Sequence, residues 1–509
     1  MGDDDEVDLH VGDLDLDDED DGPSAPPRSK GRRRMPGSVG RGRDDLPRRR
    51  RRLDQDDEDE DEGTRATAPW ERDPEAPVPR VVPAAIRLDD IDPDAAKVVK
   101  RLVRSGHVAY LVGGSVRDLL LARRPKDFDV ATSARPNEVR SLFRNCRIIG
   151  RRFRLAHILF GGGKIIETAT FRRDPGADVF DDPEIASRLV AVTPNGKDGP
   201  VEDDAPETST PSASLAPDPI ERDDVLIRHD NVFGEPHEDA IRRDFTINGL
   251  FYDVHRNEVI DYVGGLADVE ARVIRTIGSP ALRLREDPVR ILRAIKFSAR
   301  LDLGIDPDLY DAMVVTRDDL RRSAPPRVLE EVLRLLRGGA AHRSVFLALE
   351  TGVLSVVLPE VAALLDDLPL PAFWARLDVV DQRQRAGQLP TDAVLLATLL
   401  HDALDEELRD VRDQAAAFED FMDGVVERFA VPRRLKERLR SVVIAQRRLA
   451  QGRIGSLPRR DFFPEAATLH AIDLEAQGKP VPEWARKPEA ATPEPTGSGR
   501  RRHRRRRRR

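Results

Sequence analysis

Two aspartates, Asp127 and Asp129, stand two residues apart in the stretch DFDVAT. Alternate residues of a β-strand point to the same side, so a strand here places both carboxylates together and turns Phe128 toward the core. Neighbouring carboxylates repel each other unless a cation neutralises them, and Mg²⁺ is the oxygen-seeking ion that binds through few carboxylates together with substrate phosphates. A solvated acidic strand end is the alternative that a pair of this spacing leaves open.

A pair of glycines, Gly113 and Gly114, lies shortly before the aspartates, between a predicted buried strand (HVAYLV, 107–112) and a predicted helix. Glycines let the backbone approach an anion closely, and the start of a helix offers free N–H groups and the positive end of its dipole. Ser115 and Arg117, in the first turn, could donate to the same anion. Such a turn alone is more often a matter of chain geometry, but the aspartates downstream favour a phosphate site beside a metal site.

A site with two metal ions needs a third acidic group, and the sequence offers two candidates, Glu167 in IIETATF and Asp244 in RRDFTIN. Glu167 stands in an otherwise apolar and β-branched strand pattern, where an unpaired acid is costly to bury. Asp244 follows Arg242 and Arg243, which would also make an ordinary surface ion pair with it. The residues alone leave both candidates open.

The segment EDPVR pairs an acceptor with a donor at the start of a predicted helix. Asp287 is expected to cap this helix, with Pro288 at its first position. Asp287 and Arg290 are three residues apart and therefore share one face of a helix. A carboxylate beside a guanidinium complements the Watson–Crick edge of adenine or cytosine and rejects guanine and uracil. This pair does not separate use of ATP alone from use of both CTP and ATP.

Five motifs follow one another in the order typical of class II nucleotidyltransferases, the family of bacterial poly(A) polymerases and CCA-adding enzymes. They are LVGGSVRDLLLARRPKDFDVAT, IIETATFRR, EDAIRRDFTINGLFYD, DYVGGLADVEARVIRTIG and LREDPVRILRAIKFSAR. The chain resembles this family over residues 86–345. The resemblance implies a nucleotidyltransferase head, and it implies that the EDPVR segment selects the base.

By the same resemblance, Asp127 and Asp129 hold two catalytic Mg²⁺ ions, for which Mn²⁺ is a substitute. Asp244 falls at the third acidic position, and Glu167 remains an additional candidate metal ligand. The residues expected to bind the triphosphate are Gly113, Gly114, Ser115, Arg117, Arg242 and Arg243.

The run GRRFRLAH (150–157) resembles the signature of the bacterial poly(A) polymerase branch, and PRRDFFPEAATLHAIDLEAQG, from position 458, resembles its Arg-rich C-terminal module. Arg151, Arg152 and Arg154 are thus candidate contacts for RNA or nucleotide, although the residues alone, without the resemblance, favour a basic turn that leads into a strand. We predict a template-independent poly(A) polymerase that transfers AMP from ATP to RNA 3′ ends. The alternatives are a CCA-adding enzyme and, in another class, a non-catalytic RNA-binding scaffold.

Charge is strongly segregated along the 509 residues, whose net charge is −9. Acidic and basic blocks alternate near the N-terminus, and an arginine run ends the chain; such blocks are typical of disordered interaction tails, and poly-arginine favours polyphosphate partners. Cys146 is the only cysteine, which excludes an intrachain disulfide. No apolar run approaches the roughly 20 residues that span a bilayer. We therefore expect a cytoplasmic protein without a membrane partner.

The elements that must position these residues form an α+β head with a small mixed sheet, followed by an all-α neck and body. The segment DPDAAKVVKRLVRSG predicts a helix capped by Asp92, and nearly every segment after residue 280 has helical periodicity. The expected divisions are a disordered arm (1–85), the head (86–255, with a flexible insertion at about 174–225), a helical neck that selects nucleotide and binds RNA (256–345), a helical body (346–480) and a disordered poly-arginine tail (481–509).

Overall fold

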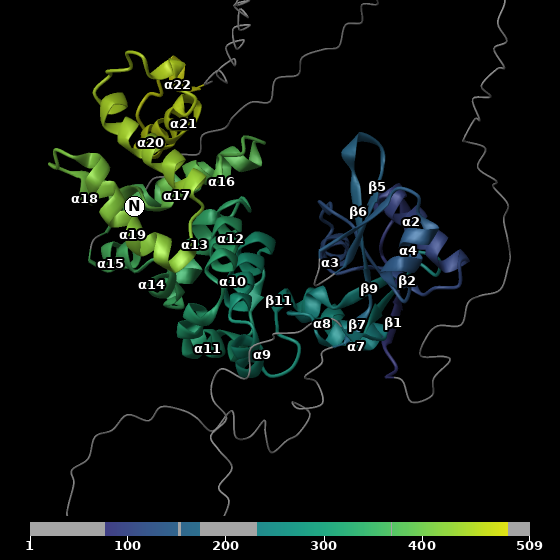
Figure 1. The fold of residues 1–509 in the computed structure, drawn as a ribbon. Helices are drawn as coiled ribbons and strands as arrows, with labels where there is room; N and C mark the ends of the chain where they lie inside the picture. The colour runs from purple at the N-terminus through teal and green to yellow at the C-terminus, as the bar shows by residue number, and fades with distance from the viewer. Residues whose placement is uncertain (1–76, 151–153, 174–231, 368, 487–509) are drawn as a thin grey trace, which may run out of the picture. The chain divides into compact units, whose positions relative to one another are not determined.

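The computed structural model describes residues 77–150, 154–173, 232–367 and 369–486 (Figure 1). Most of the predicted N-terminal arm, the predicted insertion, Arg151, Arg152 and the arginine run at the end of the chain lie outside the described residues.

An eight-stranded mixed sheet forms the centre of the head, as the sequence predicts. Its strands lie in the order β1 (Arg80–Pro83), β10 (Glu258–Asp261), β9 (Leu250–Asp253), β2 (Ala109–Val112), β3 (Asp129–Thr132), β6 (Ile165–Thr170), β5 (Leu155–Leu159) and β4 (Cys146–Ile149). Strands β3 and β6 run parallel, and every other neighbouring pair of this sheet is antiparallel.

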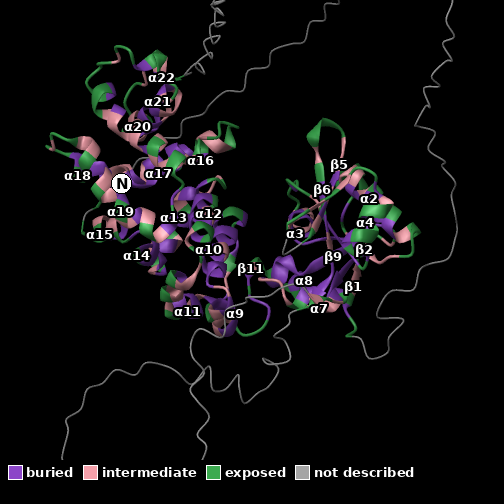
Figure 2. Cartoon of the chain, in the orientation of Figure 1, coloured by how far each residue is buried: buried purple, intermediate pink, exposed green. Residues whose placement is uncertain are grey.

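Both faces of the central strands are covered. Along β2, Leu111 belongs to the main core with helix α2 (Pro93–Arg104), whereas Tyr110 and Val112 belong to a second cluster with α7 (Pro236–Ile241). Figure 2 shows buried segments along the strands of the sheet. The other elements of the head are η1 (Leu88–Asp90), α3 (Gly114–Leu120), α4 (Pro136–Leu142), η2 (Gly161–Gly163), η4 (Thr246–Asn248), α8 (Gly265–Ala271) and the pair β7 (Arg172–Arg173) with β8 (Val232–Phe233).

Helix α2 shows how closely local sequence sets the ends of an element. The Asp92 side chain accepts from the N–H groups of Asp94 and Ala95, at 2.9 and 3.1 Å, and Pro93 is the first helical residue. A proline there loses no hydrogen bond, since the first N–H groups of a helix have no partner within it. The cap predicted for Asp92 is confirmed.

The rest of the described chain is mainly helical, as predicted (Figure 1). The helices are α9 (Pro280–Glu286), α10 (Val289–Leu301), α11 (Pro307–Thr316), η5 (Arg317–Arg322), α12 (Pro325–Leu336), α13 (Ala341–Glu350), α14 (Val353–Val357), α15 (Pro359–Asp367), α16 (Pro371–Arg385), α17 (Asp392–Leu399), α18 (His401–Leu408), α19 (Gln414–Phe429), α20 (Arg433–Ala450), η6 (Leu457–Arg459), α21 (Phe463–Ala476) and α22 (Glu483–Arg486). None of the helices in the described part of the chain has the length and apolar character needed to cross a membrane.

The observed elements cross some of the expected boundaries. Strand β1 lies within the arm predicted to lack structure, because its residues pair with β10. Strand β10 extends the head sheet beyond residue 255, since it forms a hairpin with β9. The short parallel pair β11 (Val273–Ile274) and β12 (Gly304–Ile305) lies in the part expected to be all helical. Helix α22 lies in the predicted tail, where Trp484 stacks on His470 with ring centroids 5.6 Å apart.

Candidate active site

Three acidic residues lie together at the start of β3. Asp129 is the first residue of this strand, and Asp127 lies in the loop just before it. The parallel register places Asp129 directly opposite Glu167 of β6. Residues opposite each other on neighbouring strands present their side chains on the same face, so these two carboxylates are neighbours. Phe128 is half-buried and packs against the main core, as predicted.

The electrostatics of this group show an excess of negative charge. Asp129 is exposed, yet the protein around it and the charges of Glu167 and Asp127 raise the pKa of its carboxyl to about 6, against the opposing effect of Arg243. Burial and neighbouring negative charges disfavour the ionised form of this carboxyl, so a nearby cation would stabilise that form strongly. A divalent cation would supply that partner.

The donor set fits Mg²⁺, because carboxylate oxygens are the ligands that this ion prefers. The described residues contain no group of three or more His, Cys, Asp or Glu side chains already arranged to hold a metal. Magnesium commonly binds through one or two carboxylates, water and substrate phosphates rather than in a complete protein cage. The arrangement is therefore that of a site completed by a phosphate substrate.

His157 is a polar neighbour of the acids that sequence reasoning did not single out. It lies on β5 opposite Glu167, and its Nε2 is 3.5 Å from a carboxylate oxygen of Glu167. Asp129, Glu167 and His157 thus form a row across three adjacent strands. The sequence does contain a signal for His157. It is the only polar residue in the strand LAHIL, and it lies on the same face of that strand as Leu155 and Leu159.

The glycine turn before α3 lies against an arginine. Gly113 has φ +69°, in the region that favours glycine, and a Cβ added there would come within 3.0 Å of an Nη atom of Arg243. A side chain at this position would therefore be strained and would also press on the guanidinium. Arg243 in turn lowers the pKa of Asp129 by its charge, so this arginine lies close to both the turn and the acids.

Arg243 is held by a buried carboxylate. Its Nη2 lies 2.8 Å from Asp239, and Arg242 lies 2.9 Å from the other oxygen of the same side chain. Burial alone would raise the pKa of Asp239, but the charges of Arg243 and Arg242 outweigh it and lower that pKa. Both arginines are half-exposed. The chain therefore fixes two adjacent guanidinium groups beside the glycine turn.

Ser115 and Arg117 are directed into the protein instead. The Ser115 hydroxyl donates to the carbonyl of Val112 at 3.0 Å. Arg117 is 3% exposed and donates to Asp118 and to the side chain of Asn248, at 2.6 and 2.5 Å. These contacts favour a role in positioning the turn over direct contact with a triphosphate.

The Asp244 carboxylate makes its contacts with residues other than Asp127, Asp129 and Glu167. One carboxylate oxygen accepts from its neighbour's backbone N–H at 2.9 Å and from Asn248 at 3.0 Å, and the other is 2.5 Å from Arg293 of α10. The side chain is 10% exposed. Burial would raise its pKa, but Arg293 and the hydrogen bond from Asn248 lower the pKa far below its usual range. Both oxygens of Asp244 are thus engaged within the protein.

The arrangement of Asp287 and Arg290, the pair proposed to select the base, differs from the one expected. Asp287 lies just before α10 in non-helical conformation and makes no capping bond; the N-cap position is Pro288, and the Asp287 carboxylate instead accepts from Arg327 at 2.8 Å. The cap predicted for Asp287 is therefore wrong, because this carboxylate is drawn to a guanidinium on α12. Arg290 is buried and lies 2.9 Å from Glu286.

The basic run at 150–157 is described only in part. Arg154 is exposed, whereas Arg151 and Arg152 lie outside the described residues. Their predicted contact with RNA or nucleotide stays a prediction.

The chain is similar to poly(A) polymerases over most of its length. Residues 109–275 match the family model described as the poly A polymerase head domain, and residues 302–365 match the one described as the probable RNA and SrmB-binding site of polymerase A. Poly(A) polymerase I of Salmonella typhimurium is 36% identical over 436 residues, which cover 81% of this chain and 86% of that protein. Poly(A) polymerase I of Haemophilus influenzae is 33% identical over 415 residues, covering 78% and 84%.

The CCA-adding enzymes found by sequence match about half of the chain. The CCA-adding enzyme of Bacillus velezensis is 27% identical over 260 residues, which cover 51% of this chain and 54% of that protein. The crystal structure of the Bacillus stearothermophilus CCA-adding enzyme in complex with CTP has a TM-score of 0.53 at 23% identity, covering 78% of this chain and 81% of that one. This likeness concerns the fold. Together the matches confirm the resemblance to nucleotidyltransferases that the five motifs indicate.

Proposed function

Because the chain belongs to the poly(A) polymerase family, we propose that it is a polynucleotide adenylyltransferase that adds AMP from ATP to the 3′ ends of RNA. In this reaction the 3′-hydroxyl oxygen bonds to the α-phosphorus of ATP, the bond from that phosphorus to its bridging oxygen breaks, and pyrophosphate leaves. The observation that carries the proposal is the row of Asp129 and Glu167, in register on adjacent strands with Asp127 beside them.

Mg²⁺ would be held by Asp127, Asp129 and Glu167. We propose that these residues bind two ions. When bound, such ions activate the attacking hydroxyl and stabilise the charge on the triphosphate oxygens. Glu167 is a better third acid than Asp244, since Glu167 is exposed beside Asp129 while both oxygens of Asp244 have protein partners.

The triphosphate would lie along the glycine turn. The backbone at Gly113 and Gly114 leaves room for it, and Arg243 and Arg242 supply positive charge that Asp239 holds in place. Such preorganised donors stabilise charge without having to reorient during the reaction.

Selection of the base would fall to Asp287 and Arg290. Glu286 and the carbonyl of Arg283 orient the Arg290 guanidinium, with contacts of 2.9 and 2.7 Å. Asp287 is similarly held by Arg327. A fixed acceptor and donor suit adenine, although the same pair also suits cytosine.

The test is an incorporation assay with purified full-length protein, Mg²⁺, each of the four nucleoside triphosphates in turn, and either an oligo(A) primer or a tRNA lacking its terminal CCA. Long tails from ATP on oligo(A) are expected. Addition of CMP confined to tRNA would replace the proposal with CCA addition, and RNA binding without any incorporation would indicate a scaffold.

Matched variants test the site itself. Asp129→Asn is expected to lower kcat by at least about 100-fold, whereas Asp89→Asn, an exposed aspartate in η1, should leave it unchanged. Near-normal turnover in Asp129→Asn, with its folding verified by circular dichroism, would refute the assignment of the metal site.

A further inference from the structure

The face of the head sheet that carries Asp129 has a covered part and an open part. On the covered part, Val112 of β2 and Ala131 of β3 pack in one apolar cluster with Ala240 of α7. Strands β6, β5 and β4 lie on the other side of β3, and their side chains on this face are all exposed or half-buried. Figure 2 shows the tip of the β5–β6 hairpin exposed. The open part therefore begins at the acids of the proposed metal site and extends to the edge of the sheet.

A polar row crosses the open part between two apolar rows. The row of acids and His157 described above continues to Arg147 of β4, which stands directly opposite His157. Neighbouring strands lie about 4.8 Å apart, so the backbone of Arg147 is two strands, or roughly 10 Å, from Glu167. The apolar rows consist of Ile165 with Leu159 on one side and Leu155 with Ile149 on the other.

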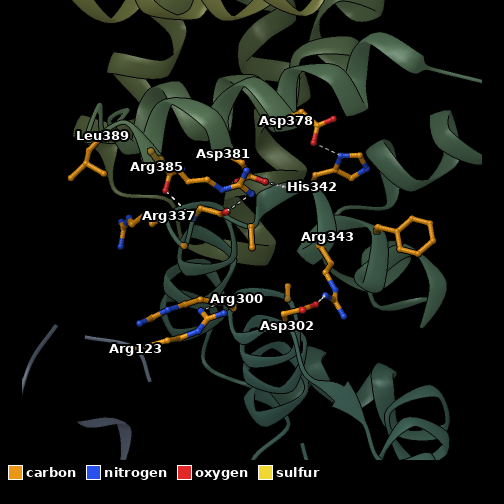
Figure 3. A pocket seen from close by; sticks show the side chains of 16 residues that line it. Arg123, Arg300, Asp302, Arg337, His342, Arg343, Asp378, Asp381, Arg385 and Leu389 are labelled. Carbon is orange, nitrogen blue, oxygen red and sulfur yellow. Dashed lines mark hydrogen bonds and ion pairs between the residues drawn. The ribbon is translucent and has the colours of Figure 1, made fainter. Parts of the chain in front are cut away.

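Arg147 keeps its positive charge available to a ligand. Its side chain is exposed, and its guanidinium has no hydrogen bond or ion pair within the described part of the chain. Arg343 of the helical part differs, because it forms an ion pair with Asp302 at an open pocket of about 950 Å³ (Figure 3). An unpaired guanidinium can bind a phosphate through two parallel hydrogen bonds.

The direction from which RNA approaches follows from the place proposed for the triphosphate. The glycine turn directly follows β2, which borders β3 on the side away from β6. Arg243 lies on that side as well, since a Cβ at Gly113 would come within 3.0 Å of it. An in-line displacement at phosphorus places the attacking oxygen opposite the leaving one. The attacking hydroxyl would therefore come from the side of β6, β5 and β4.

The chemistry of the open part matches one nucleotide at the end of an RNA strand. Such a nucleotide carries one phosphodiester charge, which a single guanidinium complements. Its ribose and base offer C–H edges and a flat face against which aliphatic side chains pack. Ile165 and Ile149 are 45% and 46% exposed and leave such surface free. A second nucleoside triphosphate fits less well, because one arginine would face several phosphate charges.

We propose that this face binds the 3′-terminal nucleotide of RNA, with Arg147 on the phosphate that precedes this nucleotide and with Ile165 and Leu159 against its ribose and base. Ile165 stands two residues before Glu167, as Asp127 stands two residues before the residue opposite Glu167, so Ile165 and Asp127 lie level. The assignment rests on the proposed function, which makes RNA the substrate. Because phosphate and ribose are the same in every RNA, these contacts would accept any terminal base.

The experiment compares Arg147→Ala and Ile165→Thr with matched controls in the full-length protein. Arg140→Ala removes the same charge from α4, which packs on the other face of β4 and β5. Leu88→Thr makes a similar change at an exposed apolar side chain of η1. Folding of each variant is verified by its Tm.

Each protein is assayed in steady-state adenylation of three oligo(A) primers. The first is unmodified, the second has a neutral methylphosphonate in place of the last phosphodiester, and the third has the same neutral linkage several nucleotides upstream.

Arg147→Ala is expected to raise the KM for the unmodified primer about tenfold, with kcat and the KM for ATP within about twofold of the unaltered values, because one charge-assisted contact to the primer is lost. In the unaltered protein the neutral last linkage should raise the primer KM by a similar factor. It should add little in Arg147→Ala, since both changes remove the same contact. The upstream neutral linkage should cost less than the last one.

The other variants have their own expected results. Ile165→Thr should raise the primer KM about threefold, because it exchanges apolar surface for a hydroxyl. Arg140→Ala and Leu88→Thr should match the unaltered protein with every primer.

Three results would overturn the proposal. One is an equal primer KM in Arg147→Ala and Arg140→Ala. Another is a full additional loss from the neutral last linkage in Arg147→Ala, since the contact to that phosphate would then lie elsewhere. The third is a rise in the KM for ATP in place of the rise for the primer.

Failure of the proposed function gives a different result. If the unaltered protein adds no AMP to any primer, binding of the same primers is measured by fluorescence anisotropy. A loss of affinity from the neutral last linkage in the unaltered protein, but not in Arg147→Ala, would uphold the binding site without the adenylyltransferase. Any other pattern would overturn the binding site as well.

Discussion

Exchanging Asp244 and Glu167 in turn for their amides distinguishes a structural acid from a metal-binding one. Both oxygens of Asp244 accept hydrogen bonds, from Arg293 on one side and from Asn248 and a backbone N–H on the other. Asparagine has only one acceptor oxygen, so in Asp244→Asn an NH₂ group must face a donor. In Glu167→Gln no comparable network is lost, because that side chain is 51% exposed.

The expected cost of Asp244→Asn follows from these contacts. Removing one partner of a buried ion pair costs roughly 3–5 kcal/mol. Arg293 is 31% exposed and also lies 3.9 Å from Glu331, so its charge is partly compensated in the variant. We therefore expect a loss of about 2 kcal/mol in the free energy of unfolding, or about 3 °C in Tm for a compact unit of this size.

The pH dependence has a definite sign. The pKa of Asp244 in the folded protein lies far below its ordinary value, chiefly because Arg293 and Asn248 outweigh the effect of burial. A carboxylate with a lowered pKa stabilises the fold above its unfolded-state pKa, and this contribution is lost as pH falls toward the folded-state pKa. The Tm difference between the unaltered protein and Asp244→Asn should thus be full at pH 7 and shrink below about pH 4.

Differential scanning calorimetry and steady-state adenylation on oligo(A) measure the two effects separately. Asp244→Asn should lose stability and, assayed well below its Tm, keep kcat within about tenfold of the unaltered value. Glu167→Gln should keep its Tm and lose at least about 100-fold in kcat. The reverse pattern, with an unchanged Tm and no turnover in Asp244→Asn, would refute this reasoning and return Asp244 to the metal site.

Three further outcomes are expected. Gly113→Ala should raise the KM for ATP, because a Cβ there is strained and lies 3.0 Å from Arg243, and an unchanged KM would argue against triphosphate binding at the turn. Asp287→Ala should raise misincorporation of GMP relative to AMP about tenfold in a competition assay, whereas unaltered selectivity would place base recognition elsewhere. His157→Ala should lower kcat about tenfold with partial rescue in His157→Gln, because Nε2 lies 3.5 Å from Glu167; equal kcat in all three proteins would make this contact incidental.

Much of the head follows from local sequence. The cap at Asp92, the glycine turn with its positive φ at Gly113, and the strand that begins at Asp129 all depend on residues within a few positions of one another. Local preferences of this kind act through short-range sterics and hydrogen bonds, so a pattern in the chain suffices to predict them. The helical character after residue 280 is equally local, since it depends on a repeat of apolar positions.

The partners of the site residues depended on the tertiary structure. Glu167 stands opposite Asp129 only because β6 pairs in parallel with β3, and Arg117 turns inward because Asn248, 131 residues away, accepts from it. The motif around Asp244 predicts a catalytic acid. In the folded chain, however, α10 packs so that Arg293 forms an ion pair with the Asp244 carboxylate. The order of residues along the chain limits which side chains are available for the chemistry. Register between strands and contacts between distant segments decided which of them meet, because both arise from the packing of the whole chain.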